Sequence, residues 1–105
     1  MQSDYIIVLT TVGSREVAGD LAKGMIGERL AACVQVQQIE SFYAWRDNIE
    51  HSNEYLLAIK TKATLFEDLS RFILQTHGYH IPEIVQIPIV KGSESYLEWI
   101  KATTK

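Results

Sequence analysis

The chain has 105 residues, of which 47% are apolar and 22% are charged, and its formal net charge is -3. This length suits one domain and the composition is typical of a globular protein, so disorder, a fibrous repeat and a two-domain organisation are set aside. The basic residues form no run, which argues against nucleic acid as a partner.

Two features of the chain predict where the protein works. No apolar run is longer than the one from Tyr5 to Leu9, which is far shorter than the roughly 20 residues of a membrane span, and the first residues lack the basic start of a signal peptide. The lone cysteine, Cys33, forms no internal disulfide and agrees with a reducing compartment. We expect one domain over 1–105, in the cytoplasm, with no membrane span.

The first third of the chain predicts a strand and a helix. Bulky, mostly β-branched residues without alternation predict a central strand near 4–11. Ser14 is a suitable N-cap for a helix with apolar residues spaced by four, namely Val17, Leu21 and Met25, and Ala18, Ala22, Ile26 and Leu30. Gly24 and Gly27 each cost this helix about 1 kcal/mol relative to Ala. They mark either the close approach of another backbone or tolerated surface positions.

The middle of the chain predicts a long hairpin with strands near 32–46 and 49–62. Apolar residues alternate from Ala32 to Val36, and the alternation slips near Gln38, which predicts a bulge or a bend there. The Asp47-Asn48 pair offers the turn.

The last part of the chain predicts a helix, an edge strand and a short final helix. Thr64 and Glu67 form a T-x-x-E capping box, ahead of the inward-facing residues Leu65, Phe66, Leu69, Phe72 and Ile73. Gly78 and Pro82 end this helix. Because Pro88 lacks an N–H, we expect its strand, near 84–90, to lie at an edge of the sheet, followed by a helix that Ser93 caps.

The predicted order is β-α-β-β-α-β with a C-terminal helix, which is an α+β, ferredoxin-like (split βαβ) sandwich. Right-handed crossovers place the first and third strands centrally and the last strand at an edge. A strand of 13 to 15 residues spans roughly 45 Å, whereas a domain of this size is about 35 Å wide. The hairpin therefore overhangs its own domain, and its exposed aromatic residues predict a closed oligomer.

Five motifs make the chain resemble a known family. They are R-L-A-A-C-V from Arg29, Y-A-W from Tyr43, I-K-T from Ile59, H-G-Y-H-I-P-E-I from His77 and Y-L-E-W from Tyr96. In this order and spacing the chain resembles the CutA divalent-cation tolerance family over nearly its whole length. The resemblance implies a ferredoxin-like homotrimer with hairpins paired between subunits. It also implies a role in metal tolerance, with copper binding by members of the family.

The loop of His77, His80 and Glu83 places three potential metal ligands at i, i+3 and i+6. Imidazole suits copper and zinc, and a carboxylate can complete such a site, so we expect weak binding of Cu(II) or another divalent cation here. The alternative is that these histidines bond the last carbonyls of the preceding helix.

This loop departs from the family pattern H-P-Y-E-x-P-E, because Gly78 replaces the proline and His80 the first glutamate. Thr10 and Thr76 stand where metal-binding members can carry a cysteine and a second histidine, and threonine is a poor ligand for copper. Cys33 could supply a thiolate, although a free cysteine is more often a small core residue.

The resemblance also implies a ligand cleft between subunits, formed by Tyr43, Trp45, Lys60, Tyr79 and Glu83. Aromatic walls with one lysine and one glutamate suit a small anionic or zwitterionic ligand. The alternative is that the aromatic residues are trimer core and that Lys60 and Glu83 form a structural ion pair. His51, near the hairpin tip, and Arg29, near the end of the first helix, receive no functional role.

Three classes of function follow from these patterns. The first is a non-enzymatic trimer that binds metal or a small effector. The second is an acylphosphatase-like enzyme, in which residues Thr10 to Ser14 at a helix N-terminus hold an anion and Arg15 assists. The third is a trimeric scaffold that presents its C-terminal helices to a partner protein.

Overall fold

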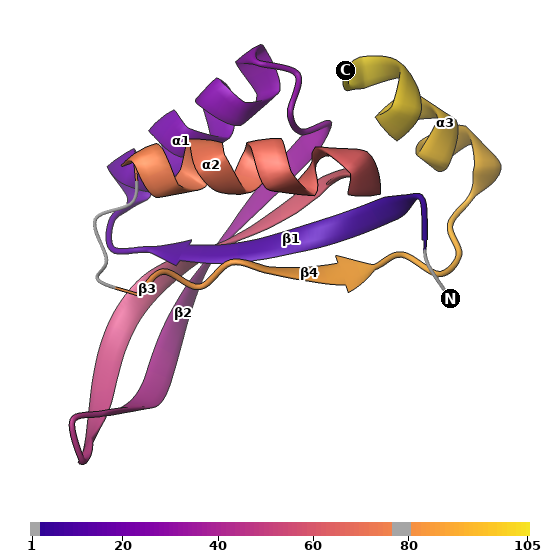
Figure 1. Ribbon diagram of the computed structural model, residues 1–105. Helices are drawn as coiled ribbons and strands as arrows, with labels where there is room; N and C mark the ends of the chain where they lie inside the picture. Colours follow the sequence, from indigo (N-terminus) through magenta and orange to yellow (C-terminus); the bar gives the residue numbers. More distant parts are fainter. Residues whose placement is uncertain (1–2, 77–80) are drawn as a thin grey trace.

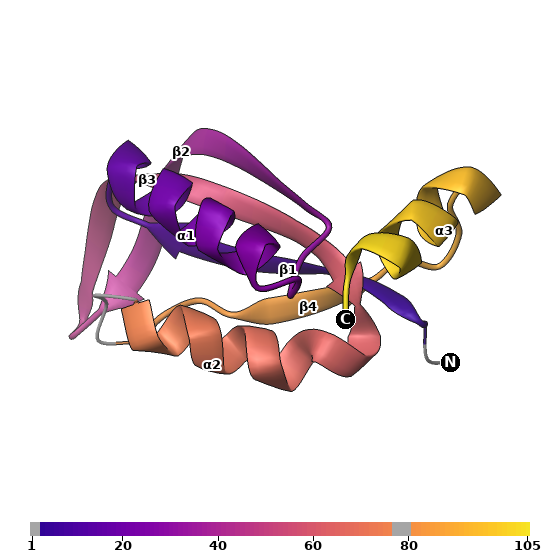
Figure 2. The same ribbon diagram turned by 90° about the horizontal axis from the view of Figure 1, so that it is seen from above.

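The computed structural model describes residues 3–76 and 81–105. Four strands form one antiparallel sheet in the order β2-β3-β1-β4, and helices α1 and α2 cover one of its faces (Figures 1 and 2). The elements are β1 Tyr5–Val12, α1 Arg15–Gly27, β2 Cys33–Trp45, β3 Asn48–Lys62, the short 3-10 helix η1 Ala63–Leu65, α2 Phe66–Thr76, β4 Val85–Pro88 and α3 Glu94–Thr103. The predicted α+β class and strand order are confirmed, with β1 and β3 central.

Strand β4 lies at the edge of the sheet, as Pro88 predicts. It pairs with β1 from Ile6 opposite Pro88 to Leu9 opposite Val85, and β1 pairs on its other side with β3. A residue without an N–H is tolerated here because one side of β4 has no neighbouring strand within the described chain. No helix of the described residues is long and apolar enough to cross a membrane.

The core lies between the sheet and helices α1 and α2. Burial alternates along β1, where Ile6 and Val8 are at most 1% exposed, and the partner strand β3 contributes Leu57 and Ile59 at 0%. These residues meet a helical layer whose most buried members are Ala18, Leu21, Met25, Leu69 and Ile73. The inward face predicted for α2 is therefore confirmed, with Phe66 and Phe72 only partly buried.

The helix starts differ from one another. Ser14 caps α1 as predicted, since its Oγ accepts a hydrogen bond from the Val17 N–H at 3.1 Å. The predicted capping box is wrong, because Thr64 lies inside η1 and α2 begins after it. Ser93 occupies the N-cap position of α3 without a side-chain cap bond.

The apolar stripe of α1 is narrower than its spacing predicts. Val17 is 41% and Ile26 45% exposed, because only Ala18, Leu21 and Met25 turn far enough towards the sheet to be buried. Gly24 does mark a close approach, but to the side chain of Phe72 in α2 rather than to a backbone.

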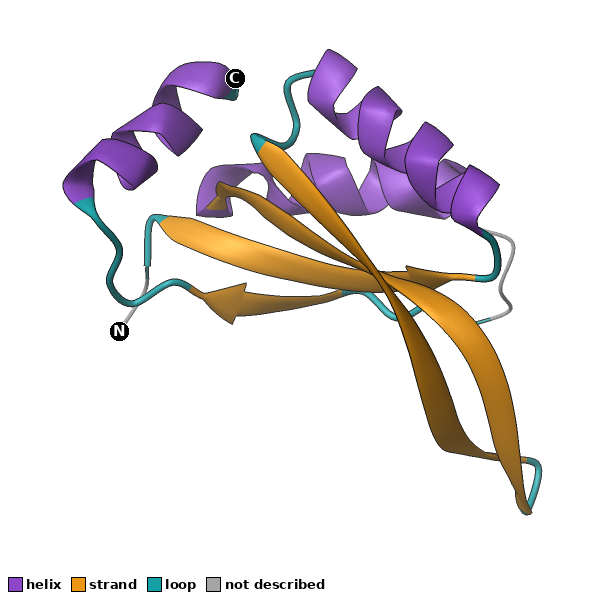
Figure 3. Ribbon diagram, turned by 180° about the vertical axis from the view of Figure 1, so that it is seen from behind, coloured by secondary structure: helices purple, strands orange, loops and turns teal. Residues whose placement is uncertain are grey.

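The hairpin runs without a bulge. Its register is continuous from Cys33 opposite Lys60 to Trp45 opposite Asn48, so the bulge predicted near Gln38 is absent and the ribbon curves as a whole (Figure 3). The turn consists of Arg46 and Asp47, with φ of 50° and 66°, one residue earlier than predicted. Two consecutive residues of positive φ match the twist of a two-residue hairpin loop.

The hairpin overhangs the domain as predicted (Figure 1). The chain measures 44 × 29 × 22 Å, and the longest dimension is close to the span expected of the hairpin strands. The projecting ribbon exposes large apolar side chains, with Phe42 68% and Ile49 86% accessible. Such a ribbon needs a covering partner.

Arg29 joins the start of the hairpin to the C-terminal helix. With φ of 59°, it directs its guanidinium to the carbonyls of Ala102, Thr103 and Thr104 at 3.3 to 3.5 Å. The Lys105 N–H donates back to the Arg29 carbonyl at 3.1 Å. Because the last carbonyls of a helix lack partners within it, Arg29 caps α3. Arg29 follows α1 in the sequence, but the helix that it caps is α3.

Candidate functional site

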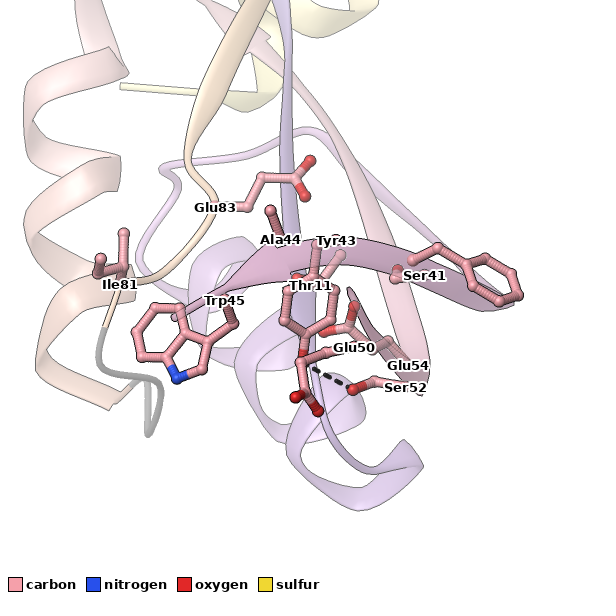
Figure 4. Close-up of a pocket in the computed structure, with 11 residues that line it drawn as sticks. Thr11, Ser41, Tyr43, Ala44, Trp45, Glu50, Ser52, Glu54, Ile81 and Glu83 are labelled. Carbon is pink, nitrogen blue, oxygen red and sulfur yellow. Dashed lines mark hydrogen bonds between the residues drawn. The ribbon is translucent and has the colours of Figure 1, made fainter. Parts of the chain in front are cut away.

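An open cleft lies where the hairpin leaves the sheet, on the face that the helices do not cover (Figure 4). Its volume is about 1010 Å³, and four segments line it: the two hairpin strands, the end of β1 and the chain before β4. Its lining residues are Thr11, Ser41, Phe42, Tyr43, Ala44, Trp45, Glu50, Ser52, Glu54, Ile81 and Glu83.

The register of the hairpin explains why polar and aromatic side chains meet in this cleft. Tyr43 lies opposite Glu50 and Ser41 opposite Ser52, and directly paired residues of neighbouring strands share a face. Because successive side chains of a strand point to opposite faces, Trp45 of β2 and Glu54 of β3 lie on this same face.

The aromatic wall of the cleft is held in place by two contacts. The Tyr43 hydroxyl is 2.9 Å from the Ser52 Oγ, drawn as the dashed line in Figure 4. The guanidinium of Arg46 lies 5.5 Å from the centre of the Trp45 ring, within the range of a cation–π contact. Each ring of the wall therefore has one polar neighbour on the hairpin.

Besides its aromatic wall, the cleft has an acidic lining. Glu50, Glu54 and Glu83 line it, and the described lining contains no lysine, arginine or histidine. Glu50 and Glu83 are exposed, whereas Glu54 is only 7% exposed. Within residues 3–76 and 81–105, no hydrogen bond or ion pair joins the Glu54 carboxylate to another group.

The structure brings together three of the five residues predicted for the ligand cleft. Tyr43, Trp45 and Glu83 share one cleft, while Tyr79 lies outside the described residues. Lys60 lies elsewhere, opposite Cys33 in the register, with its Nζ 5.4 Å from the Tyr96 ring.

Lys60 therefore contacts the C-terminal helix rather than Glu83. The ion pairs among described residues are His51–Glu40 and Arg71–Asp68, so Lys60 and Glu83 form no ion pair within the described part of one chain, and a pair between subunits stays a prediction. The cation that an anionic ligand would need is also missing from the described lining.

The predicted metal site falls largely outside the described residues, because His77 and His80 both do. Glu83, the third predicted ligand, is exposed on the cleft. Within the described part of the chain, no group of three His, Cys, Asp or Glu side chains is placed to hold one ion. The metal site therefore stays a prediction.

Two residues of the alternative anion-binding segment are already engaged in the fold. Ser14 caps α1, and Thr10 is fully buried among the core residues, with an Oγ1 that has no partner in the described structure. Cys33 is half-buried rather than enclosed in the core. His51 is exposed on the other face of the ribbon, 3.3 Å from Glu40 and stacked on Phe42 at 4.4 Å.

Sequence reasoning missed the carboxylates Glu50 and Glu54. The available signal was alternation counted outward from the turn, which places Tyr43, Glu50 and Glu54 on one face once the turn position is known. A turn placed one residue late pairs Tyr43 with Ser52 instead of Glu50, but it leaves Glu50 and Glu54 on the same face, so this signal was available in either register.

Comparison with known proteins agrees with this architecture. Residues 6–103 match the family model described as CutA1 divalent ion tolerance protein. The chain is 41% identical to the divalent-cation tolerance protein CutA of Thermus thermophilus, with 93% of this chain and 96% of that protein covered. It is 43% identical to the chloroplastic protein CutA of Arabidopsis thaliana, covering 95% of this chain but only 56% of that longer protein.

The solved structures give the same result. The CutA1 crystal structure from Shewanella sp. SIB1 superposes with a TM-score of 0.95 at 32% identity, covering 99% of this chain and 98% of that one. The structure of the Thermus thermophilus protein gives 0.93 at 39% identity, covering 96% and 99%. The fold, the long hairpin and the match over nearly the whole chain show that this protein belongs to the CutA1 divalent ion tolerance family.

Proposed function

We propose that this protein is a homotrimeric, non-enzymatic module of divalent-cation tolerance, copper included, which works by binding a metal or a small effector. The observation that carries the proposal is the projecting hairpin, whose apolar side chains Phe42 and Ile49 stand in solvent in the single chain. A ribbon of this kind is stable when another chain covers it. The family resemblance supplies the number three.

The trimer is tested by light scattering on dilute protein. The expected mass is three times 11.9 kDa, and mild dilution leaves it unchanged. A monomer mass at micromolar concentration would contradict both the interpretation of the hairpin and the inferred number of subunits.

For the metal, we propose weak binding of Cu(II) or another divalent cation by His77, assisted by His80 and Glu83, and not required for folding. Thr10 and Thr76 stand in place of stronger donors, so too few ligands remain for a closed four-ligand site. Because neutral imidazole is the ligand, affinity should fall as the pH drops below the ordinary histidine pKa of about 6.5.

A copper titration at about pH 7.5 compares the parent protein with His77→Ala and with His51→Ala, a control at the exposed hairpin tip. We expect His77→Ala alone to weaken binding. Unchanged affinity in that variant would remove His77 from the site, and tight binding retained at about pH 5 would assign the metal to the Cys33 thiolate.

The cytoplasmic location is part of the proposal and is tested by fractionating cells. The Arabidopsis relative is named chloroplastic and the Archaeoglobus fulgidus structure is named periplasmic, so family membership alone does not fix the compartment. The described structure offers no observation that favours the enzyme or the scaffold over the binding module.

A further inference from the structure

We propose that the C-terminal helix α3 is a strap that opens and closes as one unit while the rest of the protomer stays folded. A clasp of three side chains sets how often it opens. Arg29 holds the end of α3, Lys60 holds its start, and Thr61 positions the turn that carries Arg29. The strap is a moving part of the protomer, distinct from the metal and effector sites of the proposed function.

The clasp lies where three of the five family motifs meet. Arg29 begins R-L-A-A-C-V, Lys60 and Thr61 belong to I-K-T, and Tyr96 begins Y-L-E-W. None of these residues belongs to the described lining of the cleft. The fold therefore joins three distant parts of the chain at a second place, apart from the candidate site.

The backbone of Arg29 has a conformation that usually belongs to glycine. Helix α1 ends in a Schellman motif, in which the Leu30 N–H donates to the Met25 carbonyl at 2.9 Å and the Arg29 N–H to the Ile26 carbonyl at 3.0 Å. The left-handed position of this motif is most often glycine, yet here it is Arg29 with φ of 59°. A side chain at such a costly position indicates a contribution that glycine could not make.

That contribution is the bond to α3. The Arg29 guanidinium donates to the carbonyls of residues 102–104 at 3.3 to 3.5 Å, and the Lys105 N–H donates to the Arg29 carbonyl at 3.1 Å. A cation is also favoured at the negative end of a helix, so charge and hydrogen bonds act together. One residue thus ends α1 and caps α3.

Strand β3 supplies the rest of the clasp. The Thr61 Oγ1 donates to the Leu30 carbonyl at 2.7 Å in a buried setting, and this bond holds the turn beside Arg29. Lys60 points to the other face of β3, and its Nζ lies 5.4 Å from the ring of Tyr96 in the first turn of α3. Side chains of its own chain therefore hold α3 near both ends.

The packing of α3 makes it a separate unit. In Figure 2 the helix lies apart from α1 and α2, at one end of the sheet. Ile100 is fully buried, but within the described chain the main core cluster includes no residue of α3. Opening α3 therefore breaks the clasp and uncovers Ile100 and Thr104, while the core between the sheet, α1 and α2 stays closed. Segments outside the main core open at a lower free energy than the core itself.

The experiment is native-state hydrogen exchange of the whole protein at two protein concentrations. It follows the amides of residues 97–103 in α3 and those that pair β1 with β3. Arg29→Gly removes the guanidinium and suits the left-handed backbone, so α1 ends as before. Lys60→Met removes the ammonium and keeps the length of the side chain. Lys23→Met, at an exposed position of α1, is the matched control.

We expect Arg29→Gly to speed the exchange of the α3 amides about tenfold and Lys60→Met about two- to fivefold. Each variant should act by a similar factor on all the amides from 97 to 103, although the two contacts lie at opposite ends of the helix. Exchange of the amides between β1 and β3, and of every amide in Lys23→Met, should change less than about twofold.

Three results would overturn the proposal. If Arg29→Gly affects only the last turn of α3 and Lys60→Met only the first, the helix frays at its ends and does not open as one unit. If the amides between β1 and β3 speed up by the same factor, α3 opens only when the whole protomer unfolds. If α3 exchange depends on protein concentration and neither variant changes it, a neighbouring copy holds the helix in place of the clasp.

Discussion

Strand β3 passes through two different environments. Near its end, Leu57 and Ile59 are fully enclosed by the sheet and the helices, whereas near its start Ile49 is 86% exposed on the projecting ribbon. The side chains are similar and the strand geometry is continuous, so neither residue type nor periodicity sets the burial. What differs is the presence of a covering layer within the same chain. The uncovered half is where the cleft lies and where we expect assembly to occur.

The largest expected effect tests the covered half. Leu57→Ala should lower the free energy of unfolding by about 2–5 kcal/mol, because the cavity it leaves lies in a closed core. Ile49→Ala should cost less, and its cost should depend on the protomer concentration, because we expect its side chain to be covered only in the oligomer. Urea unfolding at several protomer concentrations measures both, and equal losses that do not depend on concentration would contradict the contrast between the two halves.

The second test concerns assembly at the uncovered half. Trp45→Glu should weaken the oligomer by several kcal/mol, since it places an unpaired charge where we expect the subunits to meet. Trp99→Ala, on α3 and 42% exposed, should weaken it less. Light scattering over a dilution series gives the comparison, and equal effects would show that Trp45 is not at the interface.

The fold could be predicted from sequence because its signals are local and repeated. The unbroken apolar strand, the spacing of four in α1 and the proline in β4 each depend on a few neighbouring residues. The wrong predictions concern local features whose conformation depends on tertiary packing. Thr64 fits a capping box in sequence but lies inside a 3-10 turn, and the slip in alternation near Gln38 reflects a curving ribbon without a bulge.

The site was predicted less completely than the fold. Tyr43, Trp45 and Glu83 do share a cleft, but Lys60 was grouped with them by resemblance and lies beside Tyr96. Alternation along the hairpin places Glu54 on the face of Tyr43, but it does not predict that Glu54 is only 7% exposed, since a glutamate in a hairpin is ordinarily solvated. A ligand's charge depends on such details.

The third test uses two glycines of the same helix, within the covered half. Gly27→Ala should stabilise the fold by about 0.5–1 kcal/mol through helix propensity, because an added Cβ meets nothing within 4 Å. Gly24→Ala should gain less or lose stability, because its Cβ would lie 2.8 Å from the Phe72 ring. Thermal unfolding of the two variants side by side measures the difference, and an equal gain would show that Phe72 moves aside freely.

The smallest expected effect lies at the tip of the uncovered half. Asp47 has φ of 66°, a conformation that costs a residue with a side chain more than glycine, so Asp47→Gly relieves strain in the turn. Glycine also has more freedom in the unfolded chain, and the net gain should be only a few tenths of a kcal/mol. Hydrogen exchange should show slower opening of the hairpin amides near Trp45, while amides paired with β1 stay unchanged. Equal slowing of both sets would mean that the ribbon and the covered half open as one unit, and it would contradict a difference in local stability between them.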